Sequence, residues 1–411
     1  MLNTVTERFL SYIKVDTRSD ENSNTFPSSD KQKNLAAMLA KEMEEIGVSE
    51  VIFDKEFGYV YGKIPANDGG LSPKTIAFIA HMDTAPDLDG KCVNPKFVRN
   101  YDGKDIVLNE ELGYKLTKKK FPELKEYVGK TLITTDGTTL LGADDKAGVA
   151  EIMTMAEILI TNPEIKHGPI AICFTPDEEV GAGVDNIDLE KLGADYGYTV
   201  DGGALGEIEY ENFNASSCVV TVQGVNVHPG EAKNKMRNAA LVAFEFESML
   251  PRNEKPEYTS GYEGFYHLTD MQGNEESAKL QYIVRDHDKE KFKAKKAYLE
   301  RTAEFLNQKY GEGTVSLVQK DSYYNMKEKV EPEYFFLVEY AKKCMEELDI
   351  IPRIQPIRGG TDGARLSYMG LPCPNLCAGG HNFHGRYEYV CVESMEKITE
   401  LLVKLATQIY Q

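Results

Sequence analysis

The chain has 411 residues, of which 41% are hydrophobic and 27% are charged, and its formal net charge is −19. A chain of this length exceeds one ordinary hydrophobic core, so we expect a globular protein of two domains. The negative charge argues against nucleic acid or an anionic membrane surface as a partner, because both would repel the protein.

The N-terminal segment and the cysteines indicate the cellular compartment of the protein. Residues 1–8 have neither a basic start nor an apolar core, so no signal peptide is expected, and no apolar run approaches membrane-spanning length. The seven cysteines are scattered, and the pair Cys373 and Cys377 has no second pair with which to bind zinc. Free thiols are the simplest interpretation, and they predict a cytoplasmic protein.

The first part of the chain predicts an α/β pattern whose strands end in polar residues. Periodicity predicts helices at 6–15 and 31–47 and a hairpin at 51–64. The apolar run 75–80 suits a strand buried on both faces, and His81-Met82-Asp83 follows it directly. Open α/β sheets place their sites at the carboxyl ends of such strands.

The segment 86–139 is long and polar, and it predicts little sheet structure. Its length indicates a functional role or subunit contacts rather than plain connection. After it, Asp144 and Asp145 stand immediately before a helical pattern at 147–161. Two adjacent carboxylates repel each other unless a positive group lies beside them. Alternatively, Asp145 caps the helix and Asp144 is solvated.

Two more apolar runs, 170–175 and 196–200, repeat the pattern of a buried strand followed by carboxylates. The first run leads to Glu178 and Glu179, and the second leads to Asp201. With the run before His81, three predicted strands therefore end in carboxylate or imidazole groups. We expect these groups to gather at one edge of one sheet.

The pattern changes after about residue 207, where strands and helices of a different order begin. Strands are predicted at 216–222, 265–272, 278–285 and 314–320, and helices at 238–249 and 289–310. This open-faced α+β pattern predicts a second domain at 208–325, inserted into a first domain made of 1–207 and 326–411. The first pattern then resumes. A helix is predicted at 333–348, a Gly-rich turn before a short helix at 358–363, a strand running into histidines at 375–384 and a closing helix at 394–410.

The polar residues that follow buried strands are His, Asp and Glu, namely His81, Asp83, Asp144, Asp145, Glu178, Glu179, Asp201, His381 and His384. Dications of hard or borderline character prefer such oxygen and nitrogen donors. The set suffices for two metals about 3.5–4 Å apart that share a carboxylate, with further carboxylates left for acid–base work. The sequence shows no phosphate loop, nucleophilic serine elbow or dinucleotide-binding glycine pattern that would indicate another kind of site.

Four motifs in this order resemble those of the M20 family of co-catalytic zinc peptidases, over essentially the whole chain. They are His81-Met82-Asp83-Thr84, Gly142–Gly148, Asp177–Gly181 and Asn382–Gly385. The insert after His81 and the turn Arg358–Ala364 are most similar to those of the aminotripeptidases in this family. The resemblance implies an α/β catalytic domain with a mixed sheet between helices. It also implies that the inserted α+β domain is a lid or dimerisation domain, with a possible homodimer.

The resemblance further implies two zinc ions, for which cobalt or manganese could substitute. His81 and Asp201 would bind one ion, Glu179 and His384 would bind the other, and Asp144 would bridge both.

The same resemblance assigns supporting roles. Asp83 would support the histidine ligand, and Glu178 would act as general base toward a water shared by the metals. The family has a cis peptide bond after its bridging aspartate, here Asp144–Asp145. We interpret Asp145 as a cap rather than a ligand, and His381 as a neighbour of the site with a surface or supporting role.

Three further residues concern the substrate. His228 resembles the lid histidine of the family, which approaches the scissile carbonyl, in dimeric members across the subunit interface; alternatively, it is a turn histidine before Pro229. Arg285 and Arg358 would hold the C-terminal carboxylate of the substrate, since an Arg fork binds a carboxylate at two points. The alternative for each arginine is a surface ion pair.

The resemblance thus implies a two-zinc exopeptidase that removes the N-terminal residue of tripeptides. Dipeptidase, carboxypeptidase and amide deacylase activities share the metal site, so only contacts at the substrate ends distinguish them. Arg358 and the insert 86–139 favour the tripeptidase. A non-catalytic metal- or peptide-binding protein is the alternative from another class, and the presence of Glu178 and Asp83 argues against it.

Overall fold

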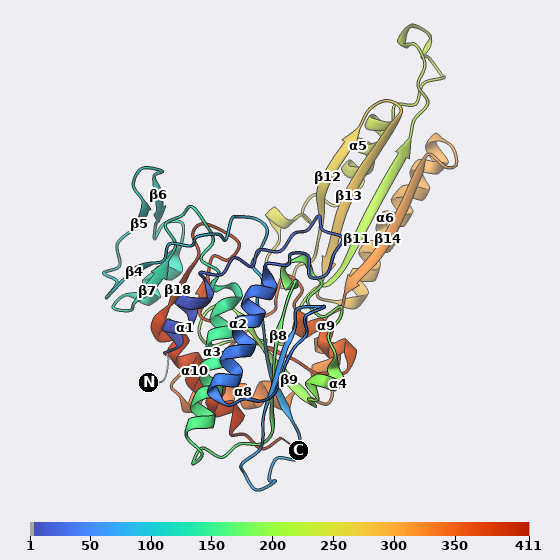
Figure 1. Cartoon of the computed structure of the whole chain (residues 1–411). Coiled ribbons are helices and arrows are strands. Elements are labelled where there is room, and N and C mark those ends of the chain that lie inside the picture. The colour runs from blue at the N-terminus through green and yellow to red at the C-terminus, as the bar shows by residue number, and fades with distance from the viewer. Residues whose placement is uncertain (1–3, 411) are drawn as a thin grey trace. The chain divides into compact units, whose positions relative to one another are not determined.

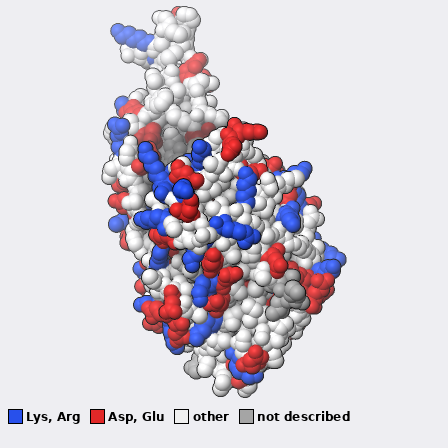
Figure 2. Space-filling view, turned by 90° about the vertical axis from the view of Figure 1, so that its left-hand side faces the viewer, with Lys and Arg blue, Asp and Glu red and all other residues white. Residues whose placement is uncertain are grey.

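The computed structural model describes residues 4–410, which form two compact units. Unit 1 runs to Tyr210 and also contains 328–355 and the chain from Thr361 onward, and unit 2 contains Glu211–Lys327 and Pro356–Gly360. The signal-peptide prediction concerns a segment whose residues 1–3 lie outside the described range. None of the described helices has the length and apolar character that a membrane crossing requires. On the face shown in Figure 2, acidic and basic side chains are interspersed.

The assignment of 356–360 to the first domain is wrong, because Arg358 packs within unit 2. Its guanidinium lies 5.1 Å from the ring centroid of Phe213. It also donates to the carbonyl of Gly261 at 2.6 Å and to that of Glu263 at 3.1 Å.

Unit 1 is built on an eight-stranded mixed sheet with the strand order β1-β2-β8-β3-β9-β16-β10-β15. The strands are β1 Ser49–Phe53, β2 Val60–Ile64, β3 Ile76–His81, β8 Ile170–Thr175, β9 Tyr196–Gly202, β10 Glu207–Glu209, β15 Arg353–Ile354 and β16 Asn375–Cys377. The central strands β8, β3 and β9 are parallel and almost wholly buried, as their apolar runs predict. Their carboxyl ends therefore meet at one edge of the sheet.

Helices cover both faces of this sheet (Figure 1). The helices of unit 1 are α1 Val5–Tyr12, α2 Gln32–Ile46, α3 Ala143–Thr161, α4 Leu189–Leu192, α7 Lys327–Val330, which begins at the unit boundary, α8 Phe336–Glu347, α9 Asp362–Met369 and α10 Val392–Ala406. Helix α3 packs against β3 and β9, with α1 and α10 beside it. On the other face, Leu192 of α4 and Leu366 of α9 share an apolar cluster with Ile79 of β3. Gly47 ends α2 in the left-handed conformation, as predicted.

The prediction that 86–139 has little sheet structure is wrong. The segment contains β4 Lys96–Val98, β5 Ile106–Asn109, β6 Tyr114–Leu116 and β7 Leu132–Thr134. Strands β5 and β6 form a hairpin, and β7 and β4 join β17 Gly380–His381 and β18 Tyr389–Cys391 in a second sheet. Strands this short show no clear periodicity in the sequence. A buried cluster joins Leu108 and Leu124 to Tyr389, so the insert packs against the segment that carries His384.

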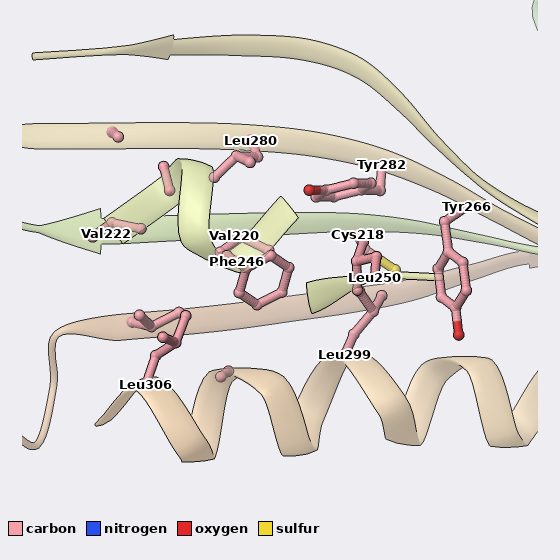
Figure 3. Packing of buried hydrophobic residues seen from close by; sticks show 14 of the residues in the cluster. Cys218, Val220, Val222, Phe246, Leu250, Tyr266, Leu280, Tyr282, Leu299 and Leu306 are labelled. Atoms are coloured by element: carbon pink, nitrogen blue, oxygen red, sulfur yellow. The ribbon is translucent and has the colours of Figure 1, made fainter. Parts of the chain in front are cut away.

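Unit 2 is a four-stranded antiparallel sheet in the order β12-β13-β11-β14, covered by two helices. The elements are β11 Asn214–Gln223, β12 Phe265–Gly273, β13 Ser277–Asp286, β14 Val315–Tyr323, α5 Ala239–Met249 and α6 Lys289–Tyr310. Strand β13 alternates between exposed or half-buried and buried residues. Its inward residues Leu280 and Tyr282 pack with Phe246 of α5 and with Leu299 and Leu306 of α6 (Figure 3).

Candidate metal centre

The five predicted metal ligands come together at the carboxyl edge of the central strands. They are His81 at the end of β3, Asp144 at the start of α3, Glu179 after β8, Asp201 in β9 and His384 after β17. They form two groups of three, in each of which the donor atoms all lie within 4.8 Å of one another. One group is His81, Asp144 and Asp201, and the other is Asp144, Glu179 and His384.

Asp144 belongs to both groups because its two oxygens face different histidines. The Nε2 atom of His81 lies 2.9 Å from Asp144 Oδ1 and 3.3 Å from Asp201 Oδ1. The Nε2 atom of His384 lies 3.2 Å from Asp144 Oδ2 and 2.9 Å from Glu179 Oε2. A carboxylate whose oxygens serve two separate donor groups has the arrangement that bridges a pair of metals.

The electrostatics of these groups fit cations. Burial raises the pKa of Glu179 to about 8 and that of Asp201 to about 6. Burial also acts to raise the pKa of Asp144, but the hydrogen bonds from His384 and His81 hold it below its usual range. One oxygen of Glu179, Oε1, is buried and has no hydrogen-bond partner among the described residues. A dication in each group would supply the missing charge and the missing partner, so the donor set suits such ions.

Asp83 and Glu178 lie beside the predicted ligands. His81 Nδ1 lies 3.1 Å from the backbone carbonyl of Asp83 and 3.3 Å from Asp83 Oδ1. The two oxygens of Asp83 also accept the backbone N–H groups of Glu178 and Glu179, at 3.0 and 3.1 Å. Asp83 therefore fixes the turn that carries both glutamates. Burial, followed by the charge of Asp201, raises the pKa of Glu178 well above its usual range.

Asp145 follows a cis peptide bond and ties two elements together. Its Oδ1 accepts from the N–H of Gly148 at 3.2 Å, which agrees with a cap, and its Oδ2 accepts from the N–H of His81 at 3.2 Å. Two other supporting residues are not predictable from the sequence motifs. Asn375 accepts the N–H of Asp201 at 3.2 Å, and Glu388 accepts backbone N–H groups at the start of α3. Neither residue belongs to a motif, so only the tertiary contacts reveal them.

His381 belongs to neither group of donors. Its Nε2 lies 2.5 Å from the hydroxyl of Tyr127, and its ring stacks on Tyr389 at 4.8 Å between centroids. Burial lowers its pKa to about 4, so the ring is neutral at neutral pH. His381 therefore supports the packing of the insert rather than facing the metal groups.

The three substrate candidates all lie in unit 2. His228 is exposed and precedes a short turn, and its Nδ1 accepts the N–H of Gly230 at 3.2 Å. Arg285 donates to the carbonyl of Arg358 at 3.2 Å, and both guanidinium groups lie within 6.0 Å of the Phe265 ring centroid.

The surface-ion-pair alternative for the two arginines has no support in their contacts. Within the described range, neither guanidinium forms an ion pair with a carboxylate, and the buried Nε of Arg285 has no hydrogen-bond partner. Two neighbouring cations without an acidic partner favour an anionic ligand.

Comparison with known proteins adds three kinds of similarity. The M20_dimer family model, described as a peptidase dimerisation domain, matches residues 210–314. The chain is 55% identical over 405 residues to peptidase T of Alkaliphilus oremlandii, which covers 98% of both chains. Its fold is similar to the crystal structure of aminopeptidase PepT of Bacillus cereus, with a TM-score of 0.75, 24% identity and 98% of each chain covered. A tripeptidase of Staphylococcus aureus is similar with a TM-score of 0.76 and 19% identity, over 99% of this chain and 98% of that one.

Proposed function

The chain belongs to the peptidase T family of M20 peptidases, and from this premise we propose that a pair of zinc ions in unit 1 serves its hydrolysis of tripeptides. As a member of this family, it is a metallo-exopeptidase of the tripeptidase class. The proposal of two zinc ions rests on the position of Asp144 between two histidines, each of which has a further carboxylate beside it. Cobalt or manganese suits the same donors.

The chemistry divides between the ligands and Glu178. One ion would be held by His81, Asp144 and Asp201, and the other by Asp144, Glu179 and His384. When bound, the metal pair supplies Lewis-acid activation of the attacking water and of the scissile carbonyl. Glu178, which belongs to neither group of donors, takes a proton from the water and passes it to the leaving amine.

Residues of unit 2 would recognise the substrate. Arg285 and Arg358 would bind the C-terminal carboxylate, and the absence of an acidic partner for either guanidinium among the described residues supports this role. Because Nδ1 of His228 accepts the N–H of Gly230, its Nε2 carries the proton and can donate to a developing oxyanion.

A homodimer through unit 2 is part of the same proposal. The match to a dimerisation domain covers most of this unit. Helix α5 exposes Leu241 and Phe244, which are 65% and 60% exposed and lie three positions apart on one helix face. We place the protein in the cytoplasm, and the free state of all seven cysteines supports this.

Peptides of matched composition and increasing length would test the function. We expect tripeptides with a free amino terminus to be cleaved faster than dipeptides, tetrapeptides or N-acetylated tripeptides. A chelator should abolish the activity, and zinc, cobalt or manganese should restore it. Full activity in a preparation that elemental analysis shows to be free of metal would contradict the metal pair. A preference for dipeptides or acylated peptides would instead indicate another M20 activity.

A further inference from the structure

The segment that follows His384 carries a buried carboxylate, Glu388, which is 1% exposed. Its Oε2 accepts the backbone N–H groups of Leu141 at 2.8 Å and Gly142 at 3.0 Å. Its Oε1 accepts the N–H of Asp144 at 3.1 Å. All three bonds of this carboxylate therefore go to the few residues that place Asp144.

The backbone around Asp144 needs such an acceptor from outside the helix. The first N–H groups of a helix have no partner within it, and the N-cap residue here, Gly142, has no side chain to offer. Gly142 is in the left-handed region with φ of 81°, and Asp144 and Asp145 depart from helical φ and ψ. The α-helical ladder therefore does not fix Asp144, whereas the carboxylate of Glu388 does.

We propose that Glu388 is a positioning residue for the metal pair. It holds the bridging carboxylate of Asp144 in place from the same chain segment that supplies His384, although Asp144 and Glu388 are 244 residues apart in the sequence. The inference rests on the metal roles proposed for Asp144 and His384. The alternative is an ordinary helix cap, which would stabilise the fold without affecting metal binding.

The variant Glu388→Gln separates these roles. An amide keeps the size of the side chain but replaces one acceptor oxygen with a donor, so at least one of the three N–H groups loses its partner. We expect zinc to bind about 10–100-fold more weakly, as is typical when a partner that orients a ligand is lost. Competition with a chromophoric chelator measures this affinity. The visible spectrum of the cobalt-loaded protein should also change, because the bridging carboxylate moves.

Glu393→Gln is the matched control. Both oxygens of Glu393 accept the N–H of Thr131, at 3.0 and 2.9 Å, so this carboxylate also holds a backbone amide but contacts no proposed ligand. We expect both variants to lower the Tm of the metal-free protein. Only Glu388→Gln should change the zinc affinity and the cobalt spectrum.

The outcomes distinguish the inference from the function on which it rests. If Glu388→Gln does not fold, Glu388→Asp takes its place, because its shorter carboxylate cannot reach all three amides. Wild-type zinc affinity with an unchanged cobalt spectrum, in whichever variant folds, would overturn the role of Glu388. If the wild-type protein binds no metal, or if Asp144→Ala binds it as tightly as wild type, the metal centre itself is refuted.

Discussion

Glu178 and Glu179 are neighbours in one turn, yet we expect only the substitution of Glu179 to lower the metal content. The Oε2 atom of Glu179 lies 2.9 Å from His384 Nε2, whereas Glu178 belongs to neither group of donors. Asp83 holds the backbone N–H of both residues, so a change of either side chain leaves the turn in place. Glutamine keeps the size of each side chain and removes its charge. The pair Glu178→Gln and Glu179→Gln is therefore matched in everything except the predicted role.

Glu178→Gln should retain both metal ions and lose the proton acceptor. A general base contributes about 10²–10⁴ in rate, which corresponds to roughly 3–5 kcal/mol of transition-state stabilisation. Glu179→Gln should lose one of the two ions, because its group keeps only Asp144 and His384. Elemental analysis of the purified variants measures the metal content, and steady-state kinetics with one tripeptide measures kcat.

Two results would refute this assignment. If Glu178→Gln lost metal and Glu179→Gln kept both ions, the roles of the two glutamates would be reversed. If Glu178→Gln retained the wild-type kcat with both ions bound, another group would be the base. Circular dichroism of both variants serves as the control for folding.

Three further predictions concern recognition and stability. Arg358→Ala should raise the KM for free tripeptides and erase their preference over C-terminally amidated ones, because a charge-assisted hydrogen bond contributes about 1.5–3 kcal/mol; an unchanged ratio of the two KM values would exclude this role. His228→Ala should lower kcat and kcat/KM by about 10²–10³ with full metal content, and hybrid dimers with Glu178→Ala should regain activity if the histidine acts across the interface. Burial raises the pKa of Glu209 to about 8, so the folded state holds a proton that the unfolded state has lost between about pH 4.5 and 8. Stability should therefore fall as the pH rises through this window, and Glu209→Gln, which can still accept from Asn375, should reduce that fall in thermal unfolding scans.

The central sheet and the gathering of polar residues at its carboxyl edge could be predicted because one physical pattern links them. Strands buried on both faces are continuous apolar runs, and β3, β8 and β9 follow the predicted runs within a few residues. His81 and Asp201 lie inside β3 and β9 rather than after them, which is a small shift at the strand ends. The carboxyl ends of parallel strands then bring distant residues together without any further information.

The insert and the supporting residues could not be predicted in this way. The strands of 86–139 have three or four residues, too few for a period of two to be recognised. Residues 356–360 belong to unit 2 through the contacts of Arg358 with Phe213 and Gly261, which no local pattern indicates. Glu388 likewise acts on amides more than 240 residues away.

Five acids of the centre fall into two classes according to their donors. Asp83, Asp145 and Glu388 accept backbone N–H groups, which supply partial positive charge to a buried carboxylate. Asp144 and Glu179 instead face histidine nitrogens, and no backbone N–H of the described residues donates to them. The adjacent pair Asp144 and Asp145 contains one member of each class. Backbone amides hold the side chains of the first class in place, whereas the oxygens of Asp144 and Glu179 face imidazole groups, so the donors separate these two proposed ligands from the residues that hold them in place.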